Sequence, residues 1–239
     1  MKKISSPVLE ISNLYKTEKH KVIEKFNLIL QSGESMALLY KNDENIELLC
    51  DILKGQKRVD KGKIFFKSAD VTDSKNIFGV IEKKPEIPKT RSVIDIGCSP
   101  IVKRGLSKSM ASVLVKKELG AFLLNEQGDK TAYLLPKNLK LRTEVFGAYM
   151  CSHELMAIDE PYLDLSPDQR ETELELLEKV KRSVGLSLLV FTKDIDTAVR
   201  LADSVMIIND KTQSVGIISV DEKKIQKTKD KINELYQSV

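Results

Sequence analysis

The chain has 239 residues, of which 41% are hydrophobic, and this is enough to bury the core of one domain with a smaller subdomain attached. Its formal net charge of +4 is spread over 39 basic and 35 acidic residues, whereas a nucleic-acid-binding surface needs basic residues clustered on one face, so no nucleic-acid partner is expected. No run of about 18 apolar residues is present and the N-terminus lacks an apolar signal core, so the sequence predicts a cytoplasmic protein that neither crosses a membrane nor is secreted.

The three cysteines, Cys50, Cys98 and Cys151, are far apart in the sequence, and none of them forms a CxxC pair. An odd number of scattered cysteines with only two histidines in the chain does not indicate a metal site or a disulfide framework. We therefore expect buried, reduced thiols.

The first part of the chain is rich in short strands. Residues 8–11 alternate apolar and polar side chains as a half-buried strand does, and residues 22–30 predict a second strand. Residues 35–39 form a continuous apolar run, which is typical of a strand covered on both faces. Residues 45–54 then carry apolar side chains at helical spacing and stop at Gly55, so strand, loop and helix follow one another.

Further along, residues 62–66 and 77–81 predict short strands, and residues 90–152 are expected to be mainly helical. The last third alternates strands with helices, which are predicted at residues 155–158, 168–184, 187–191, 195–202, 204–208 and 214–218. Strands that alternate with helices indicate an α/β fold with a parallel sheet.

Several short segments occur in a fixed order along the chain. They are residues 33–39 (Gly-Glu-Ser-Met-Ala-Leu-Leu), 62–64 (Gly-Lys-Ile), 159–161 (Asp-Glu-Pro), 163–167 (Leu-Asp-Leu-Ser-Pro), and 189–194 with 198–203 after it. Their order and spacing resemble the nucleotide-binding domain of ABC transporters across nearly the whole chain. The resemblance implies one α/β domain over residues 1–239, with a P-loop NTPase-like core, a mostly parallel sheet and an N-terminal antiparallel β part. It also implies a helical subdomain at about 88–152 and a C-terminal helix at about 221–239.

The resemblance places a degenerate phosphate loop, which includes Asn42, directly after residues 35–39. This loop has the form GxxxxGK[ST] in the family, because its glycines let backbone N–H groups approach the phosphates, its Lys contacts the β/γ oxygens and its Ser/Thr ligates Mg²⁺. Here Tyr40 stands for the first Gly, Asn45 for the second, Ile46 for the Lys and Glu47 for the Ser/Thr.

Acidic residues also crowd this loop. Asp43, Glu44 and Glu47 would oppose a triphosphate at a helix N-terminus that normally receives an anion. Lys41 is a conceivable substitute donor, but we favour the simpler interpretation that Asp43 and Asn45 cap the following helix.

Other working residues of the family are replaced as well. Lys137 and Asn138 stand in the slot of the Leu-Ser-Gly-Gly-Gln signature loop, which contacts the γ-phosphate held by the opposite subunit, and Lys193 replaces the switch histidine. The glutamine that ligates Mg²⁺ falls near Glu82, and Tyr15 is the nearest aromatic residue to the adenine-stacking position. The resemblance therefore implies a cassette that has lost most of its nucleotide contacts.

The family's Asp-Glu pair is intact in this chain, as Asp159 and Glu160. In the family pattern Asp159 would hold Mg²⁺ through water, and Glu160 would act as the general base that orients or deprotonates the attacking water. The alternative, which we favour, is that Asp159 makes a hydrogen bond at the end of a buried strand while Glu160 and Pro161 start the next loop.

Our leading hypothesis is a catalytically degenerate subunit of an ABC-type membrane complex, a pseudo-ATPase peripheral on the inner face of the membrane. It would be a structural or regulatory partner of a membrane subunit, and a groove formed by residues 82–152 would receive a helix of that subunit. It would also dimerise with a second ATPase-like chain or with itself. No cofactor is expected; ATP and Mg²⁺ would bind only if nucleotide binding survives. Two alternatives remain: a low-activity ATPase with atypical phosphate contacts, and a soluble binding module on the same fold.

Overall fold

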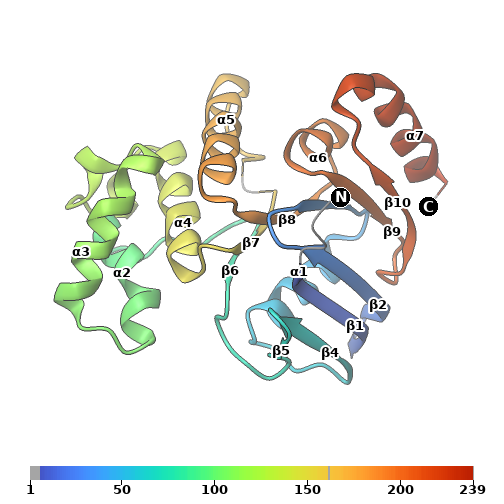
Figure 1. Cartoon of the computed structure of the whole chain (residues 1–239), viewed down its shortest axis with the longest axis horizontal. Helices are drawn as coiled ribbons and strands as arrows, with labels where there is room; N and C mark the ends of the chain where they lie inside the picture. The colour runs from blue at the N-terminus through green and yellow to red at the C-terminus, as the bar shows by residue number, and fades with distance from the viewer. Residues whose placement is uncertain (1–5, 161, 239) are drawn as a thin grey trace.

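The strands form two sheets within residues 6–160 and 162–238, which the computed structural model describes. The smaller sheet is antiparallel, with the strand order β2-β1-β4-β5 (Figure 1). In β2, Phe26, Leu28 and Leu30 are buried and alternate with exposed positions, so this strand covers the core with one face. The strands are β1 (Pro7–Glu18), β2 (Lys21–Gln31), β4 (Lys61–Phe66) and β5 (Ala69–Asp70).

The larger sheet has the strand order β10-β9-β3-β8-β7-β6. Its strands are β3 (Ser35–Leu39), β6 (Gly79–Ile81), β7 (Leu155–Asp159), β8 (Ser187–Thr192), β9 (Ser204–Ile208) and β10 (Ser214–Ser219). Neighbours from β9 to β6 are parallel, whereas β10 runs antiparallel to β9. The predicted fold class is confirmed, with a mostly parallel sheet and an N-terminal antiparallel β part.

Helices lie on both faces of the larger sheet. They are α1 (Asp43–Leu53), α2 (Val93–Lys103), α3 (Lys108–Glu118), α4 (Lys137–Cys151), α5 (Pro167–Val184), α6 (Ile195–Leu201) and α7 (Ile225–Gln237). Short 3₁₀ turns occur at Leu119–Phe122, Asn125–Gln127, Ala132–Leu134 and Glu222–Lys224. Helix α5 shows why the sequence sets these bounds: Ser166 caps its start by accepting a hydrogen bond from the N–H of Gln169, and Gly185 ends it in the left-handed region.

Strand β3 lies between two hydrophobic cores. All of its residues are buried, and its side chains alternate between the sheet faces. Ala37 and Leu39 pack into the core shared with α5, α6 and α7, whereas Met36 and Leu38 pack into the core formed with α1 and the antiparallel sheet. The expectation of a strand covered on both faces is therefore confirmed.

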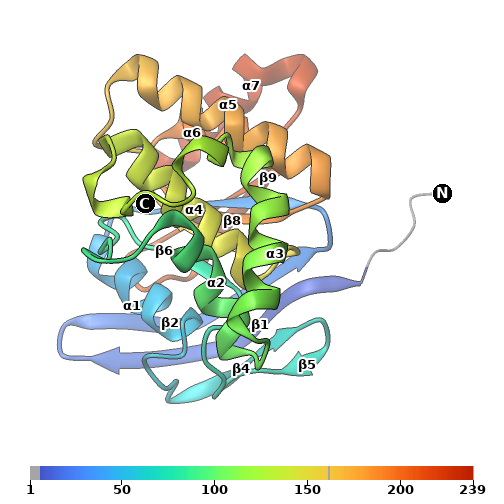
Figure 2. The same ribbon diagram turned by 90° about the vertical axis from the view of Figure 1, so that its left-hand side faces the viewer.

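Helices α2, α3 and α4 form a separate lobe, at the left of Figure 1 and facing the viewer in Figure 2. Its centre is Phe146, whose ring lies 5.2 Å from that of Phe122 in an edge-on contact. A buried ion pair ties the lobe to α5, because Arg142 donates from Nη2 and Nε to the Glu173 carboxylate at 2.6 and 2.9 Å. The lobe falls within the predicted helical range of 88–152.

Some predicted bounds were wrong. Helix α1 begins at Asp43, two residues before its predicted start, and β6 is confined to the last part of the strand predicted at 77–81. The C-terminal segment predicted at 221–239 is helical in α7, whereas residue 239 lies outside the described residues. All three cysteines are buried and free. Among the described residues, no helix combines the length and apolar character needed to span a bilayer.

Candidate functional site

The loop between β3 and α1 is short, and the side chain of one of its residues, Asn42, caps the helix that follows. Asn42 has an extended backbone and is the N-cap of α1. Its Oδ1 accepts hydrogen bonds from the N–H groups of Glu44 at 3.0 Å and Asn45 at 3.4 Å. The prediction that Asp43 and Asn45 cap this helix was wrong, because Asn42 occupies the capping position and α1 starts one residue later.

The next residues of α1 point into the protein. Ile46, which we placed from the sequence at the position of the family lysine, is fully buried in the core under the antiparallel sheet. Asn45 is also buried; its Oδ1 accepts the N–H of Val22 at 2.6 Å, and its Nδ2 donates to the carbonyl of Asp210. Glu47 is more exposed, and its carboxylate pairs with Lys21 at 3.0 Å. These side chains hold α1 against its neighbours.

A tyrosine and an aspartate meet between the ends of β3 and β7. The Tyr40 hydroxyl donates to Oδ1 of Asp159 at 2.9 Å, and both side chains are buried. Burial raises the pKa of Asp159 to about 6, although the hydrogen bond from Tyr40 acts in the opposite direction. Burial and the neighbouring Asp159 also raise the pKa of the Tyr40 hydroxyl well above its ordinary value. The tyrosine therefore remains a neutral donor at physiological pH.

Glu160 is held by the strand beside it. Its Oε1 accepts hydrogen bonds from the Thr192 hydroxyl at 2.9 Å and from the backbone N–H of Lys193 at 2.5 Å. Its own N–H donates to the carbonyl of Phe191 at 3.1 Å, and its φ of 42° lies in the left-handed region. Pro161 lies outside the described residues. The carboxylate thus stabilises an unusual backbone turn at the end of β7.

Asp43 joins the loop to two lysines. Its Oδ1 accepts from Nζ of Lys83 at 3.0 Å, and its Oδ2 accepts from Nζ of Lys193 at 2.7 Å. Burial would raise the pKa of this carboxyl, but the hydrogen bonds from Lys193 and Lys83 outweigh it and the pKa is lowered. The ammonium of Lys193 also lies 5.4 Å from the centre of the Tyr40 ring. Lys193, which we predicted at the switch position, is thus an internal partner of Asp43.

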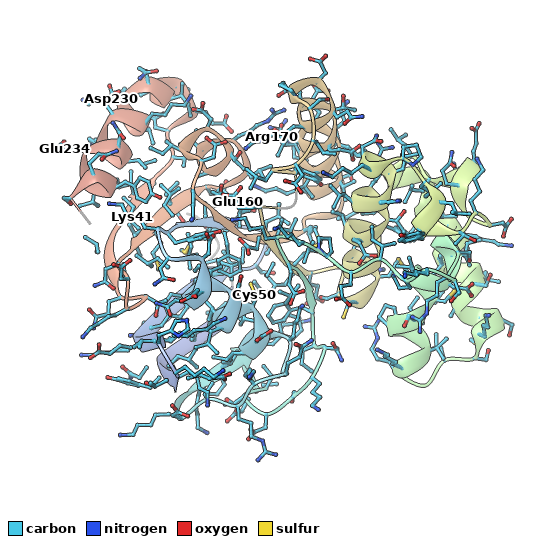
Figure 3. All side chains as sticks on the ribbon, turned by 180° about the vertical axis from the view of Figure 1, so that it is seen from behind. Lys41, Cys50, Glu160, Arg170, Asp230 and Glu234 are labelled. Carbon is cyan, nitrogen blue, oxygen red and sulfur yellow. The ribbon has the colours of Figure 1, made fainter. Side chains whose placement is uncertain are left out.

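Helix α7 covers the same loop. The Tyr236 hydroxyl donates to the carbonyl of Tyr40 at 2.7 Å. Lys41 lies beside α7 (Figure 3), and its Nζ is 5.4 Å from the centre of the Tyr236 ring. The C-terminal helix therefore packs directly onto the backbone that would approach a phosphate.

The remaining predicted residues make no hydrogen bond or ion pair with this cluster among the described residues, although Glu82 lines the same cavity as Asp43 and Asp159. Lys137 begins α4, and its Nζ donates to the carbonyl of Asp164 at 2.9 Å. Asn138 donates to Glu173 at 3.3 Å, and Glu82 pairs with Lys54 at the end of α1. Tyr15 lies on β1, where it pairs with Lys61 of β4. The predictions of nucleotide contacts at these positions stay predictions.

Three of the contacts in this site were not predicted from the sequence, and they are made by the Tyr40 hydroxyl, Lys83 and Tyr236. Tyr40 follows a buried strand directly, and this position could have drawn attention to its side chain. Lys83 follows the predicted glutamine position, but nothing in the sequence indicates its contact with Asp43, which lies 40 residues earlier. Tyr236 lies 196 residues after Tyr40, and its contact depends on how α7 packs.

Comparisons with known proteins agree with this architecture. A cassette of an ABC transporter solved without nucleotide superposes with a TM-score of 0.77 at 16% identity, over 96% of this chain and 98% of that one. The cbiO1 structure from Clostridium perfringens, part of the cbiONQ transporter complex, gives 0.78 at 19% identity, over 98% and 96%. The chain has the fold of an ABC transporter ATP-binding domain.

Relatives found by sequence are also ATP-binding proteins of transporters. The cobalt import ATP-binding protein CbiO of Rhodobacter capsulatus is 26% identical over 77% of this chain and 69% of its own length. The energy-coupling factor transporter ATP-binding protein EcfA1 of Symbiobacterium thermophilum is 23% identical over 81% and 70%. The chain spans about two thirds of the length of the curated relatives it matches. No protein-family model matches the sequence.

Proposed function

We propose that the chain is a catalytically degenerate ATP-binding-cassette subunit of an ABC-type membrane transport complex. In this role it is a structural or regulatory partner of a membrane subunit and of a second ATPase-like chain. The observation that carries the proposal is the loop after β3, where side chains of the protein itself occupy the contacts that a nucleotide would need.

The first support is the lack of fit for phosphate. A helix N-terminus binds an anion through free N–H groups and the positive end of the helix dipole. At α1, the N–H groups of Glu44 and Asn45 already donate to the Asn42 side chain, and Ile46 supplies no charge. A triphosphate would have to displace the cap and then face the carboxylates of the first turn.

The second support is the lack of fit for Mg²⁺. A bound Mg²⁺ is usually held by one or two carboxylates together with substrate phosphates. Oδ1 of Asp159 instead accepts the Tyr40 hydroxyl, so a carboxylate oxygen that would hold such an ion is already engaged within the protein. A cavity of about 450 Å³ beside Asp159 is lined with more carboxylates than lysines, so its charge opposes the phosphates that would share the ion. Its lining side chains include Asp43, Glu47, Asp51, Glu82, Asp159, Lys21, Lys83 and Lys84.

The third support is a groove suited to a partner. A cavity of about 770 Å³ lies between the helical lobe and β6, and its lining comes partly from the predicted range of 82–152 and partly from residues 54–81. Pro85, Pro88 and Ile96 are among the lining residues that come from the predicted range. The relatives named above are ATP-binding subunits of transporters, and the proposal extends that assembly to this chain.

The test is calorimetric titration of the purified chain with ATP and Mg²⁺. The Rhodobacter cobalt import protein, titrated in the same way, serves as positive control. We expect absent or millimolar binding, because the phosphate contacts are occupied within the protein. Micromolar binding that is lost in Asp159→Asn would overturn the proposal, since it would require a working nucleotide site.

A low-activity ATPase is the second candidate. It is favoured by the survival of Asp159 and Glu160 together at the end of β7. Under the main proposal, Glu160→Gln leaves the transport activity of the assembled complex nearly unchanged, provided that the variant is as stable as the wild type. A loss of about tenfold or more, the size that removal of a general base produces, would favour the ATPase.

A further inference from the structure

The groove between the helical lobe and the core contains a carboxyl group, that of Glu144, with one oxygen that accepts no hydrogen bond from the described residues. Its floor combines apolar and small residues from several elements, including Phe78, Ile81, Ile96 and Ala148. The space of about 770 Å³ is large enough for the side chains of one or two helical turns. Glu144 of α4 also faces this space.

One oxygen of the Glu144 carboxyl is buried without a hydrogen bond, while the residue as a whole is half-buried. Its Oε1 is buried, and none of the described residues donates a hydrogen bond to it. Two of the cations that share the lining are directed elsewhere: Lys54 pairs with Glu82, and Arg104 donates to the carbonyls of Met150 and Cys151. The arrangement leaves an acceptor at the floor of a partner-sized groove.

A buried carboxylate oxygen destabilises the fold unless a hydrogen-bond donor binds to it. A buried carboxylate without a donor loses its hydration and gains nothing in return. Burial alone raises the pKa of Glu144 to about 7, so no nearby cation offsets it. A guanidinium or an ammonium placed in the groove would supply both the charge and the hydrogen bonds, most fully as a two-pronged Arg contact.

The rim of the groove carries the opposite charge. Lys75, Arg91 and Lys103 are exposed there, and none of them forms an ion pair with another described residue. Glu86 is the exposed acidic residue at this rim. An occupant that is complementary to the whole groove therefore has a cation at its centre and acidic residues at its flanks.

We propose that Glu144 anchors an Arg or Lys side chain carried into the groove by a helix of the partner, whose flanking turns are acidic. This inference rests on the proposed function, because it takes the occupant to be a cytoplasmic helix of the membrane subunit. It adds the chemistry by which that helix is recognised.

The experiment uses two synthetic helical peptides that differ at one residue. Both have Leu and Ala on the groove-facing side and Glu in the outer turns; the central residue is Arg in one and citrulline, its uncharged analogue, in the other. Binding to the full chain is measured by fluorescence anisotropy at pH 7.5. The protein variants are Glu144→Gln and, as a matched control with the same charge change outside the groove, Glu126→Gln.

We expect the Arg peptide to bind the wild type about tenfold more tightly than the citrulline peptide, as a charge-assisted contact predicts. Glu144→Gln should abolish this preference, whereas Glu126→Gln should retain it. Equal binding of the two peptides to the wild type, or a preference that survives in Glu144→Gln, would overturn the anchor and leave the groove as a docking site. If neither peptide binds, both the anchor and the docking role of the groove are rejected.

Discussion

Asp159→Asn is expected to stabilise the protein at alkaline pH. In the fold, burial raises the pKa of this carboxyl from 3.8 to about 6. Because one pH unit is worth about 1.4 kcal/mol, keeping Asp159 ionised costs about 3 kcal/mol. An asparagine retains an oxygen that can accept the Tyr40 hydroxyl, so the variant avoids most of that cost.

The direction of this pH dependence follows from proton linkage. The folded state holds the proton of Asp159 more tightly than the unfolded state does, so the contribution of Asp159 to stability is most favourable below pH 3.8 and falls as pH rises from 3.8 through 6. The advantage of the variant should therefore be largest at pH 8, at up to about 3 kcal/mol, and should shrink steadily between pH 6 and pH 4. This pH dependence separates an ionisation effect from a change in packing.

The assay is urea unfolding followed by circular dichroism at pH 5, 6.5 and 8. Asp43→Asn is the matched control, because hydrogen bonds from Lys193 and Lys83 outweigh burial and lower the pKa of Asp43. That variant should lose stability by a similar amount at all three values, since the contribution of Asp43 disappears only below its ordinary pKa of 3.8. A constant difference between wild type and Asp159→Asn from pH 5 to 8 would refute the reasoning.

Three further variants test contacts that hold the site and the lobe. Tyr40→Phe removes the donor to Asp159 and should cost about 1.5–3 kcal/mol at pH 8 in the same assay; a loss below about 0.5 kcal/mol would mean that water replaces the hydroxyl. Arg142→Ala leaves the Glu173 carboxylate buried and unpaired and should cost about 3–5 kcal/mol, while adding Glu173→Leu should recover much of it, as a double-mutant cycle would measure. Tyr236→Phe should cost about 1 kcal/mol and speed amide hydrogen exchange in the loop after β3; unchanged exchange would contradict the bracing role of α7.

Much of the fold could be predicted because its signals are local. The strand predicted at 204–208 is β9 to the residue, since a short apolar run bounded by polar residues has few other solutions. β1 is longer than predicted because its alternation is interrupted at Asn13, which has a positive φ and marks an irregularity in the pairing with β2. α1 was placed late because the capping role of Asn42 is visible only in the backbone geometry.

The candidate site was less predictable, because its contacts join distant parts of the chain. The position of Asp159 at a strand end followed from the pattern of residues, but its partner lies 119 residues away. The lysines around Asp43 come from two different loops, and their spacing in the sequence carries no signal. Glu144 was unremarked in the sequence, since its isolation depends on which side chains fail to reach it in three dimensions.

The close contact between β6 and α4 has a mechanical consequence. A Cβ added to Gly79 would come within 2.4 Å of the Ala148 carbonyl oxygen, so backbone meets backbone there without a cushion of side chains. Lys83, which binds Asp43, follows β6 by two residues. A displacement of α4 by a partner in the groove would therefore shift β6 directly, because no side chains lie between the two backbones to take up the movement. Such a joint would pass force from the helical lobe to the start of α1.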